Sequence, residues 1–424
     1  MNEELYSKVN LKILASYFKQ LRVEKGYSLR GVADAANLSH VIISDFENGR
    51  LYPNLETLVS IFHQLGISFC IDSDRLSHYK QTIEMLNEAI YYQNLDQIKL
   101  YSERLLEVDT LLRNSLLFLD YKLAIISYNI SFKKQLDPTE LLELESSYEH
   151  LTEQQKHRFN TIVGAMYYKL ENPVKALQYL ERNLNLFGNK KAHALTLTYL
   201  SRSFLHLFQI SNTIHYGKEA SALHAHFANF NRKITSDLMV ARMLIEVGRY
   251  KQAHQIVSSI ELTTNLEEHF DILQETRFLK SYILYRKKDF QQALTVLYQY
   301  PFKTTYVYFY EAMLYVRSNN IAKALDVLVK SLNQKIVKND FVYSRVNQVA
   351  VYYYNQQFDH PNYEKLVLEL MTNRFKISDV QVFRLVFEML VTYYEYHKQY
   401  KKALETSKSY IQWTGRTTLF ETNH

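Results

Sequence analysis

The scarcity of chain-breaking residues restricts the fold of this chain more than any other feature. Its 424 residues include only 9 glycines and 5 prolines, roughly a quarter of the usual share. Sandwiches, barrels and glycine-rich nucleotide-binding folds need many more turn residues than this. Long helices joined by short turns are compatible with so few breakers. The sequence therefore predicts an all-α protein.

Cysteine content and hydropathy indicate where such a chain works. Its single cysteine, Cys70, excludes an internal disulfide framework and a cysteine-rich zinc module. Cys70 has no motif around it that would activate a nucleophile, so we expect a buried thiol. The first ten residues lack the pattern of a signal peptide. The longest apolar run, residues 116–126, is interrupted by Asp120 and Lys122 and is too short for a membrane span. These features predict a cytoplasmic protein.

The net charge of +6 is unevenly distributed. Residues 1–71 contain seven basic and seven acidic residues, whereas residues 72–424 contain 43 basic and 37 acidic residues. A basic excess favours nucleic acid as a partner. Because the excess lies outside the first 71 residues, charge alone supports that hypothesis only weakly.

The first 71 residues carry the start and stop signals of four short helices. Ser28 and Ser39 are expected to cap helices over residues 29–36 and 40–48. Asn37 lies between these helices, where Asn tolerates the left-handed conformation that a sharp turn needs. The remaining signals predict helices over residues 11–22 and 55–65 and glycine stops at Gly26, Gly49 and Gly66.

The string SLRGVADAANLS, followed by ISDFENG, joins two of these helices through a tight turn. With Pro53 and the fourth helix, it resembles the helix-turn-helix of λ-repressor-like regulators over residues 11–67. In that family the second helix of the motif lies in the major groove. By this resemblance the base-reading residues are His40, Val41, Ser44 and Asp45. The other DNA-binding residues that the resemblance implies are Ser28, Ser39, Asn48, Arg50 and Asn54.

The chain departs from that family on the reading face. Leu29 stands where many members carry a phosphate-binding Gln, and the face is poor in Arg, Gln and Asn. Arg22 and Glu47 match a family pair that ties the first helix to the reading helix, so we expect a structural ion pair. Neutral charge and an apolar reading face leave a second hypothesis open, in which this segment docks or dimerises proteins. The residues expected in the core rather than at DNA are Val32, Ala33, Ile43 and Phe46.

A second pattern recurs from about residue 75 onward. A large residue is followed nine positions later by a small or apolar one, across a short polar turn. The pairs are Tyr167/Ala176, Phe204/Thr213, Leu244/Ala253, Leu284/Ala293, Tyr315/Ala324, Tyr354/Tyr363 and Tyr394/Ala403. They resemble tetratricopeptide repeats, helical hairpins in which a small residue lets the two helices pack closely. The sequence therefore predicts a helix-turn-helix domain over residues 1–71 and a right-handed tetratricopeptide-like α-solenoid of about eight or nine hairpins over residues 72–424.

Such a solenoid has a concave groove lined by the first helix of each hairpin. Arg202 and Arg242 share one repeat position, so we expect two neighbouring cations that hold a peptide carboxylate, with apolar peptide side chains toward Tyr282. One alternative is that each Arg pairs with a nearby carboxylate such as Glu246, and another is a merely solvated face. The candidate peptide-binding residues are Thr198, Arg202, Arg242, Phe278, Tyr282, Tyr285, Gln348, Tyr352 and Asn355.

The combination of the two segments resembles the peptide-sensing transcription regulators of Gram-positive bacteria called RRNPP. That resemblance implies a homodimer that binds a palindromic operator in double-stranded DNA and a short signalling peptide in the solenoid. It implies cytoplasmic, pheromone-controlled regulation of transcription. The alternative is an adaptor whose solenoid binds another regulatory protein.

Other chemistry has little support in the sequence. Four imidazoles cluster between residues 206 and 226, but they do not form a recognisable metal-ligand motif, so we expect no metal site. A glycine-rich phosphate loop, a His-Glu-x-x-His motif and a serine elbow are all missing from the sequence. We therefore expect neither a cofactor nor an enzyme activity.

Overall fold

The computed structural model describes residues 8–132, 145, 148–186, 190–263, 270–299, 304–333 and 341–414. Throughout these residues the regular structure is helical, and a single bridge between Cys70 and Ser115 is the one trace of β pairing among them. The prediction of an all-α chain is confirmed. The chain divides into two compact units, residues 1–170 with 178–199 and residues 171–177 with 200–424. The predicted domain boundary at residue 71 lies inside the first unit and stays a prediction.

The first unit begins with the four helices expected from the sequence. These are α1 (Lys8–Glu24), α2 (Leu29–Ala35), α3 (His40–Glu47) and α4 (Leu55–Gln64). Ser28 and Ser39 cap α2 and α3 as predicted, because each hydroxyl oxygen accepts a hydrogen bond from a first-turn backbone amide. Asn37 adopts a positive φ of 54° in the turn between them. The three predicted glycine stops also have positive φ: Gly26, Gly49 and Gly66.

A small aromatic core holds these four helices together. Phe18 of α1 packs against Phe46 of α3 and Phe62 of α4, with ring centroids 5.6 and 5.1 Å apart. All three side chains are fully buried, as are Ile43 and Ala33. The expectation that Val32, Ala33, Ile43 and Phe46 form core is confirmed. The buried face fixes which side of α3 is left for a partner.

The rest of the first unit is also helical. Its helices are α5 (Ser73–Tyr92), α6 (Leu95–Leu106), α7 (Asp109–Arg113), α8 (Phe118–Ser131) and α10 (Glu153–Lys169), with the short 3-10 turns η1 (Tyr148–His150) and η2 (Glu181–Asn185). Cys70 is half-buried rather than buried as predicted. Its backbone amide donates to the Asn114 carbonyl at 2.9 Å, which ties the segment before α5 to the residue that follows α7.

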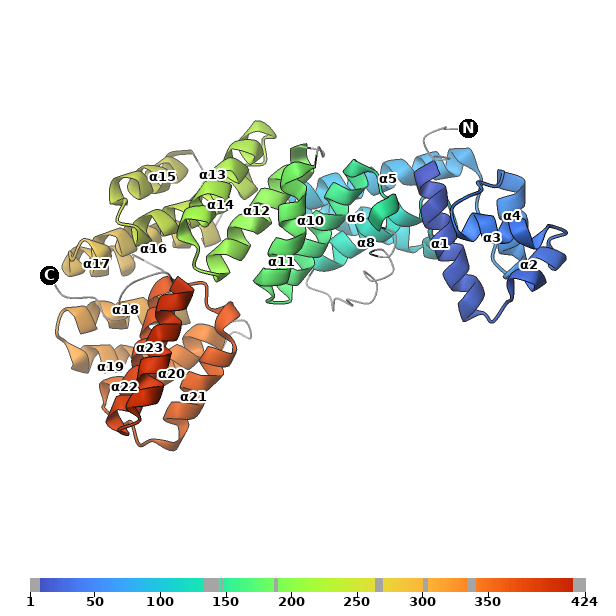
Figure 1. Ribbon diagram of the computed structural model, residues 1–424. Helices are drawn as coiled ribbons and strands as arrows, with labels where there is room; N and C mark the ends of the chain where they lie inside the picture. Colours follow the sequence, from blue (N-terminus) through green and yellow to red (C-terminus); the bar gives the residue numbers. More distant parts are fainter. Residues whose placement is uncertain are drawn as a thin grey trace. The chain divides into compact units, whose positions relative to one another are not determined.

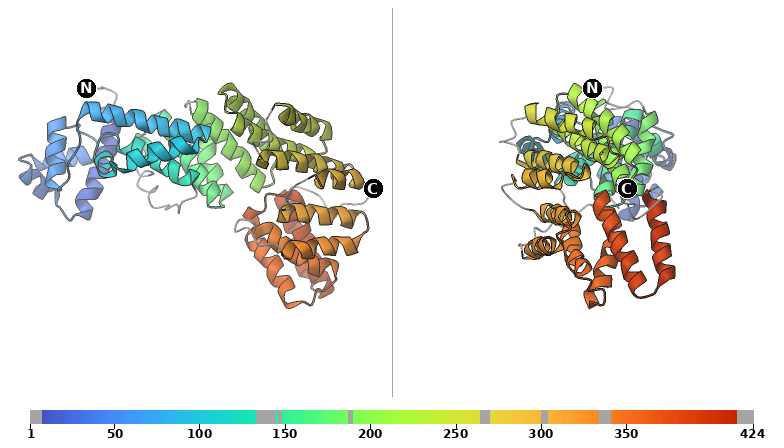
Figure 2. Two further views of the ribbon diagram at one scale, coloured as in Figure 1. Left: turned by 180° about the vertical axis from the view of Figure 1, so that it is seen from behind. Right: turned by 90° about the vertical axis from the view of Figure 1, so that its left-hand side faces the viewer.

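The second unit consists of helical hairpins (Figure 1). Its helices are α13 (Ile210–His226), α14 (Phe230–Glu246), α15 (Tyr250–Thr263), α16 (Phe270–Arg286), α17 (Phe290–Leu297), α18 (Thr305–Arg317), α19 (Ile321–Leu332), α20 (Phe341–Tyr354), α21 (Pro361–Thr372), α22 (Val380–Tyr396) and α23 (Tyr400–Thr414), with the 3-10 turn η3 (Arg374–Lys376). Two further helices, α11 (Pro173–Leu180) and α12 (Lys190–His206), contribute residues to both units. Figure 2 shows α22 and α23, in red, as one antiparallel pair.

The turn of each hairpin follows the nine-residue pattern of the sequence. A residue with positive φ ends the first helix of each hairpin, at Glu171, Phe208, Gly248, Lys288, Asn319, Gln356 and Lys398. This left-handed residue closes the helix end and lets the second helix run back along the first. The second members of the seven pairs are all buried, with side chains no more than 5% exposed. Close packing of the hairpin helices is therefore confirmed at these positions.

Gly217 shows how closely neighbouring helices of the second unit approach. A Cβ atom there would lie 2.7 Å from Val240 Cγ2 of α14 and 3.1 Å from Ser201 Oγ of α12. Real Cβ atoms do not come that close, so only glycine fits between α12, α13 and α14 without displacing a neighbour. No helix in the described residues is long and apolar enough to cross a membrane.

Candidate functional site

The exposed face of α3 carries the residues predicted to read bases. His40 and Val41 are exposed, and the Val41 side chain is 50% accessible to solvent. Ser44 and Asp45 are half-buried on the next turn of the same helix. The opposite face of α3 is held in the core by Ile43. The structure thus brings the four predicted reading residues onto the outward side of one helix.

The residues predicted to contact the DNA backbone surround this helix. Ser28 Oγ accepts from Gly31 N at 2.9 Å, and Asn54 Oδ1 accepts from Thr57 N at 2.8 Å, so both side chains cap helices. Asn48 is exposed at the end of α3, where its amide donates to the Ser44 carbonyl at 2.7 Å. Arg50 is exposed, and its Nη1 lies 3.9 Å from Asp45 Oδ1. Helix N-termini and an exposed guanidinium are groups that bind phosphate oxygens.

A buried ion pair fixes α1 to the end of α3. Arg22 Nε and Nη2 donate to the two Glu47 carboxylate oxygens at 2.5 and 2.9 Å, and Arg22 Nη1 donates to the Tyr27 carbonyl at 2.7 Å. The side chains are only 11% and 3% exposed. The hydrogen bond to Glu47 raises the pKa of the Arg22 guanidinium. The predicted structural pair is confirmed, and it sets the orientation of α3.

Comparison with known proteins assigns this segment to a family. The sequence profile of the helix-turn-helix family matches residues 18–71. Residues 18–71 are a helix-turn-helix domain. A curated relative, the HTH-type transcriptional regulator DdrOP3 of Deinococcus deserti, is 42% identical over 55 residues. That alignment covers 13% of this chain and 43% of the relative, so the match spans less than half of the relative's length.

Solved structures extend the likeness beyond the helix-turn-helix domain. A Rap protein in complex with Competence and Sporulation Factor has a TM-score of 0.61 and 15% identity, and the match covers 80% of this chain and 98% of the Rap chain. The apo quorum sensor NprR from B. thuringiensis has a TM-score of 0.60, 15% identity and coverage of 80% and 99%. NprR with its cognate peptide NprX has a TM-score of 0.57, 17% identity and coverage of 77% and 98%. The resemblance to RRNPP regulators in fold, a helix-turn-helix domain followed by a tetratricopeptide-like solenoid, is confirmed.

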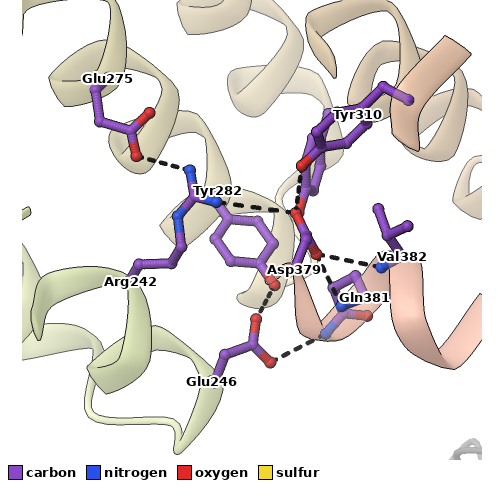
Figure 3. A network of polar contacts seen from close by, with 9 residues as sticks. Arg242, Glu246, Glu275, Tyr282, Tyr310, Asp379, Gln381 and Val382 are labelled. Atoms are coloured by element: carbon purple, nitrogen blue, oxygen red, sulfur yellow. Dashed lines mark hydrogen bonds and ion pairs between the residues drawn. The ribbon is translucent and has the colours of Figure 1, made fainter. Parts of the chain in front are cut away.

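In the second unit, predicted peptide-binding residues meet in a buried polar network (Figure 3). Arg242 of α14, with a side chain 21% exposed, donates from Nη2 to Glu275 Oε1 of α16 at 2.7 Å. Its guanidinium also lies over the Phe278 ring, 5.2 Å from the centroid. Tyr282 stacks on Phe278 and on Tyr285, with ring centroids 5.8 and 5.9 Å apart. These four predicted residues therefore form one cluster on α14 and α16.

The partner of Arg242 decides between two expectations raised by the sequence. Arg242 is paired with Glu275, so the expectation of a cation awaiting an anionic ligand is wrong at this residue. The alternative, that Arg242 pairs with a nearby carboxylate, is confirmed with Glu275 as the partner. Glu246, the carboxylate named as an example, accepts hydrogen bonds from the Tyr282 hydroxyl and from Arg286 Nη1, the latter at 3.0 Å. The sequence could not separate these carboxylates, since Glu275 lies one hairpin further along the chain.

Two members of this cluster were not anticipated: Asp379, which precedes α22, and Gln381, which lies in its first turn. Asp379 Oδ2 accepts from the Tyr310 hydroxyl at 2.5 Å and from the Tyr343 hydroxyl at 2.8 Å. Gln381 Nε2 donates to Glu246 Oε2 at 3.2 Å. The only sequence signal was that of an N-cap, an Asp before an apolar helical run. Asp379 does cap α22, through Oδ1 and the Gln381 and Val382 amides.

Burial keeps the tyrosines of the network in their neutral, proton-donating form. Desolvation, followed by the charge of Asp379, places the pKa of Tyr310 and of Tyr343 well above the ordinary tyrosine value. Desolvation and the Glu246 charge do the same for the pKa of Tyr282. These hydroxyls therefore stay protonated at neutral pH and donate hydrogen bonds to the carboxylates.

The remaining predicted peptide-binding residues have other surroundings. Gln348 accepts a hydrogen bond from Arg345 at 3.2 Å, and Tyr352 stacks on His360 with ring centroids 4.0 Å apart. Asn355 is exposed in the turn after α20. Two more predicted residues lie on α12: Arg202 is half-buried, and Thr198 is buried with its hydroxyl donating to the Ala194 carbonyl.

A cavity of about 710 Å³ lies within the first unit, among α5, α8, α10 and α12. Its volume is in the range of small-molecule sites. Charged and polar side chains in its wall are paired with one another, as in the hydrogen bond from Arg158 to Asn87 at 2.5 Å and the ion pair of Lys191 with Glu88 at 2.6 Å. No group of three metal-ligating side chains occurs in the part of the chain that the structure describes.

Proposed function

We propose that this protein is a cytoplasmic transcription regulator that binds operator DNA through residues 18–71 and is controlled by a short peptide bound in the solenoid. The observation that carries the proposal is a helix-turn-helix domain with an outward-facing α3, followed in the same chain by the fold of Rap and NprR. DdrOP3 is named as a transcriptional regulator. NprR is named as a quorum sensor and has been solved with a peptide.

The geometry of α3 supports DNA as the partner. Val41 can contact a thymine methyl group, His40 can reach a purine N7, and Asp45 can accept from a cytosine amino group. Two copies of such a domain on a palindrome require a two-fold dimer. We infer a homodimer in which peptide binding in the solenoid changes the placement of the two reading helices.

Replacing His40 and Asp45 together by Ala should strongly reduce sequence preference while leaving binding to random DNA in place. Base-edge contacts contribute about 1–3 kcal/mol of discrimination each, so the preference for the best sites should fall about 10-fold or more. The preferred sites are first selected by the wild-type protein from a pool of random DNA duplexes. Their affinity relative to a scrambled duplex is then measured for each variant.

Arg50→Ala should have a different effect, because Arg50 is exposed beside the helix rather than on its reading face. Loss of one phosphate contact should weaken binding to all duplexes alike and reduce the slope of log K against log salt by about 0.9. Asp34→Ala, on the exposed side of α2, serves as the matched control. Failure of the wild-type protein to enrich any sequence would contradict the proposal and favour the adaptor hypothesis.

A further inference from the structure

Three hydrogen-bonding and charged groups on three separate helices converge on one carboxylate oxygen in the second unit. Tyr310 of α18 and Tyr343 of α20 donate to Asp379 Oδ2 at 2.5 and 2.8 Å, and Arg242 Nη1 of α14 lies 4.0 Å from the same oxygen (Figure 3). The donors are held by the first helices of three hairpins. The carboxylate belongs to the connector that precedes α22 and is 6% exposed.

We propose that Arg242, Tyr310 and Tyr343 form a carboxylate-binding site that Asp379 of the same chain occupies, and that a peptide binds by placing its own carboxylate there in exchange. The inference rests on the proposed function for the identity of the ligand as a peptide. It goes further in naming the group that the site recognises and the internal group that competes for it.

Residues within four positions of Asp379 contact earlier hairpins through a main-chain carbonyl and an apolar side chain, two groups that a peptide also has. The main-chain carbonyl of Phe375 is hydrogen-bonded to His206 Nδ1 of α12 at 2.5 Å. The Phe383 ring lies 4.2 Å from the Phe208 ring, centroid to centroid. A peptide with a carboxylate, free main-chain carbonyls and an apolar side chain presents the same set of groups.

An internal occupant lowers the apparent affinity of an external ligand. The dissociation constant is divided by the fraction of molecules in which the site is open, so weakening the internal contact strengthens binding of the external carboxylate. Conversely, a bound carboxylate favours the open state by its differential affinity for that state. Removing the Asp379 carboxylate should therefore create a vacant site that small carboxylates fill.

The first test uses formate as the probe and the Asp379→Ala variant. Sodium formate should raise the midpoint of thermal unfolding of this variant by about 3–5 °C relative to sodium chloride at the same ionic strength, because formate binds only the folded site. The wild-type midpoint should not respond, since its site is filled. An equal response of variant and wild type would overturn the proposal.

Asp289→Ala is the matched control for loss of a helix cap. Asp289 caps α17 by accepting from the Gln292 amide at 3.2 Å, but it is exposed at the surface. Its replacement should destabilise the chain without creating a formate site. Formate stabilisation of Asp289→Ala to the same extent as Asp379→Ala would show a cap effect and overturn the assignment.

Trp413, the one tryptophan of the chain, reports on this region directly. It stacks on Phe383 of α22, with centroids 6.1 Å apart, and Arg374 lies 3.8 Å above its ring. Asp379→Ala should shift its emission to longer wavelength and increase quenching by acrylamide. An unchanged emission spectrum in Asp379→Ala would contradict displacement of the α22 start.

The second test uses two pools of random short peptides without Asp or Glu, one with free C-termini and one amidated. Immobilised Asp379→Ala should retain about tenfold more of the free-acid pool, and more of it than wild type retains. Equal retention of the two pools by Asp379→Ala would overturn the assignment. The formate test needs neither peptide nor DNA. A positive formate result without peptide retention would therefore establish the carboxylate site and refute the proposed peptide ligand.

Discussion

Replacement of Arg22 by Ala is expected to lower the free energy of unfolding of the helix-turn-helix domain by about 3–5 kcal/mol. The variant leaves the Glu47 carboxylate, whose side chain is 3% exposed, without the two hydrogen bonds that it accepts from Arg22. It also removes the donor to the Tyr27 carbonyl, which holds the chain between α1 and α2. An unpaired buried charge costs far more than the pair itself contributes.

Amide hydrogen exchange in the full-length protein is the appropriate measurement, since a chain with two compact units need not unfold in one step. Amides of α1 and α3 should exchange faster in Arg22→Ala, whereas those of α22 should keep their protection. The double variant Arg22→Met/Glu47→Leu removes both charges and should recover most of the lost stability. Unchanged exchange in Arg22→Ala would show that the pair contributes little to the domain.

The helix-turn-helix domain could be predicted almost completely because its signals are local. Ser28 and Ser39 cap helices that begin at the next residue, and Asn37 adopts a turn conformation that its own side chain tolerates. The Arg22 and Glu47 pair spans 25 residues but belongs to a known motif. The sequence could not show whether the Ser28 and Ser39 side chains also bind DNA phosphates. Their hydroxyl oxygens already accept hydrogen bonds from backbone amides of the helices that they cap.

The hairpins could be predicted for the same reason, whereas the partners of the buried charges could not. A nine-residue pattern fixes each turn, and Ala253 or Ala293 is buried where the pattern requires a small residue. Gln381 and Glu246, in contrast, are 135 residues apart and meet only through the packing of several hairpins. Repeat arithmetic places Arg242 and Tyr282 at matching positions of neighbouring hairpins, but it gives no information about a carboxylate contributed by a later hairpin. The membership of the cluster therefore depends on polar contacts between residues far apart in the sequence. The only local signal among them was the helix cap at Asp379.

Stability of the protein is expected to fall steeply as the pH drops from about 6.5 toward 4, because of two buried histidines. His157 of α10 and His224 of α13 are fully buried. Desolvation lowers the pKa of each imidazole from 6.5 to about 4, and the neighbouring His193 adds to the shift at His157. Between these values the unfolded chain binds a proton that the folded chain does not. Each histidine should then reduce the free energy of unfolding by about 1.4 kcal/mol per pH unit, or roughly 3 kcal/mol by pH 4.

His157→Phe tests this mechanism because neither ring nitrogen of His157 has a hydrogen-bond partner among the described residues. The substitution therefore sacrifices no polar contact, and at pH 7.5 stability should change little. At pH 5 the variant should be more stable than wild type by about 2 kcal/mol, since Phe has no proton to bind in the unfolded state. Urea unfolding of both proteins between pH 4 and 7.5, with exchange of α10 amides as the local readout, measures the difference. A variant that loses stability toward low pH as steeply as the wild type would show that carboxylates, rather than buried imidazoles, control the acid response.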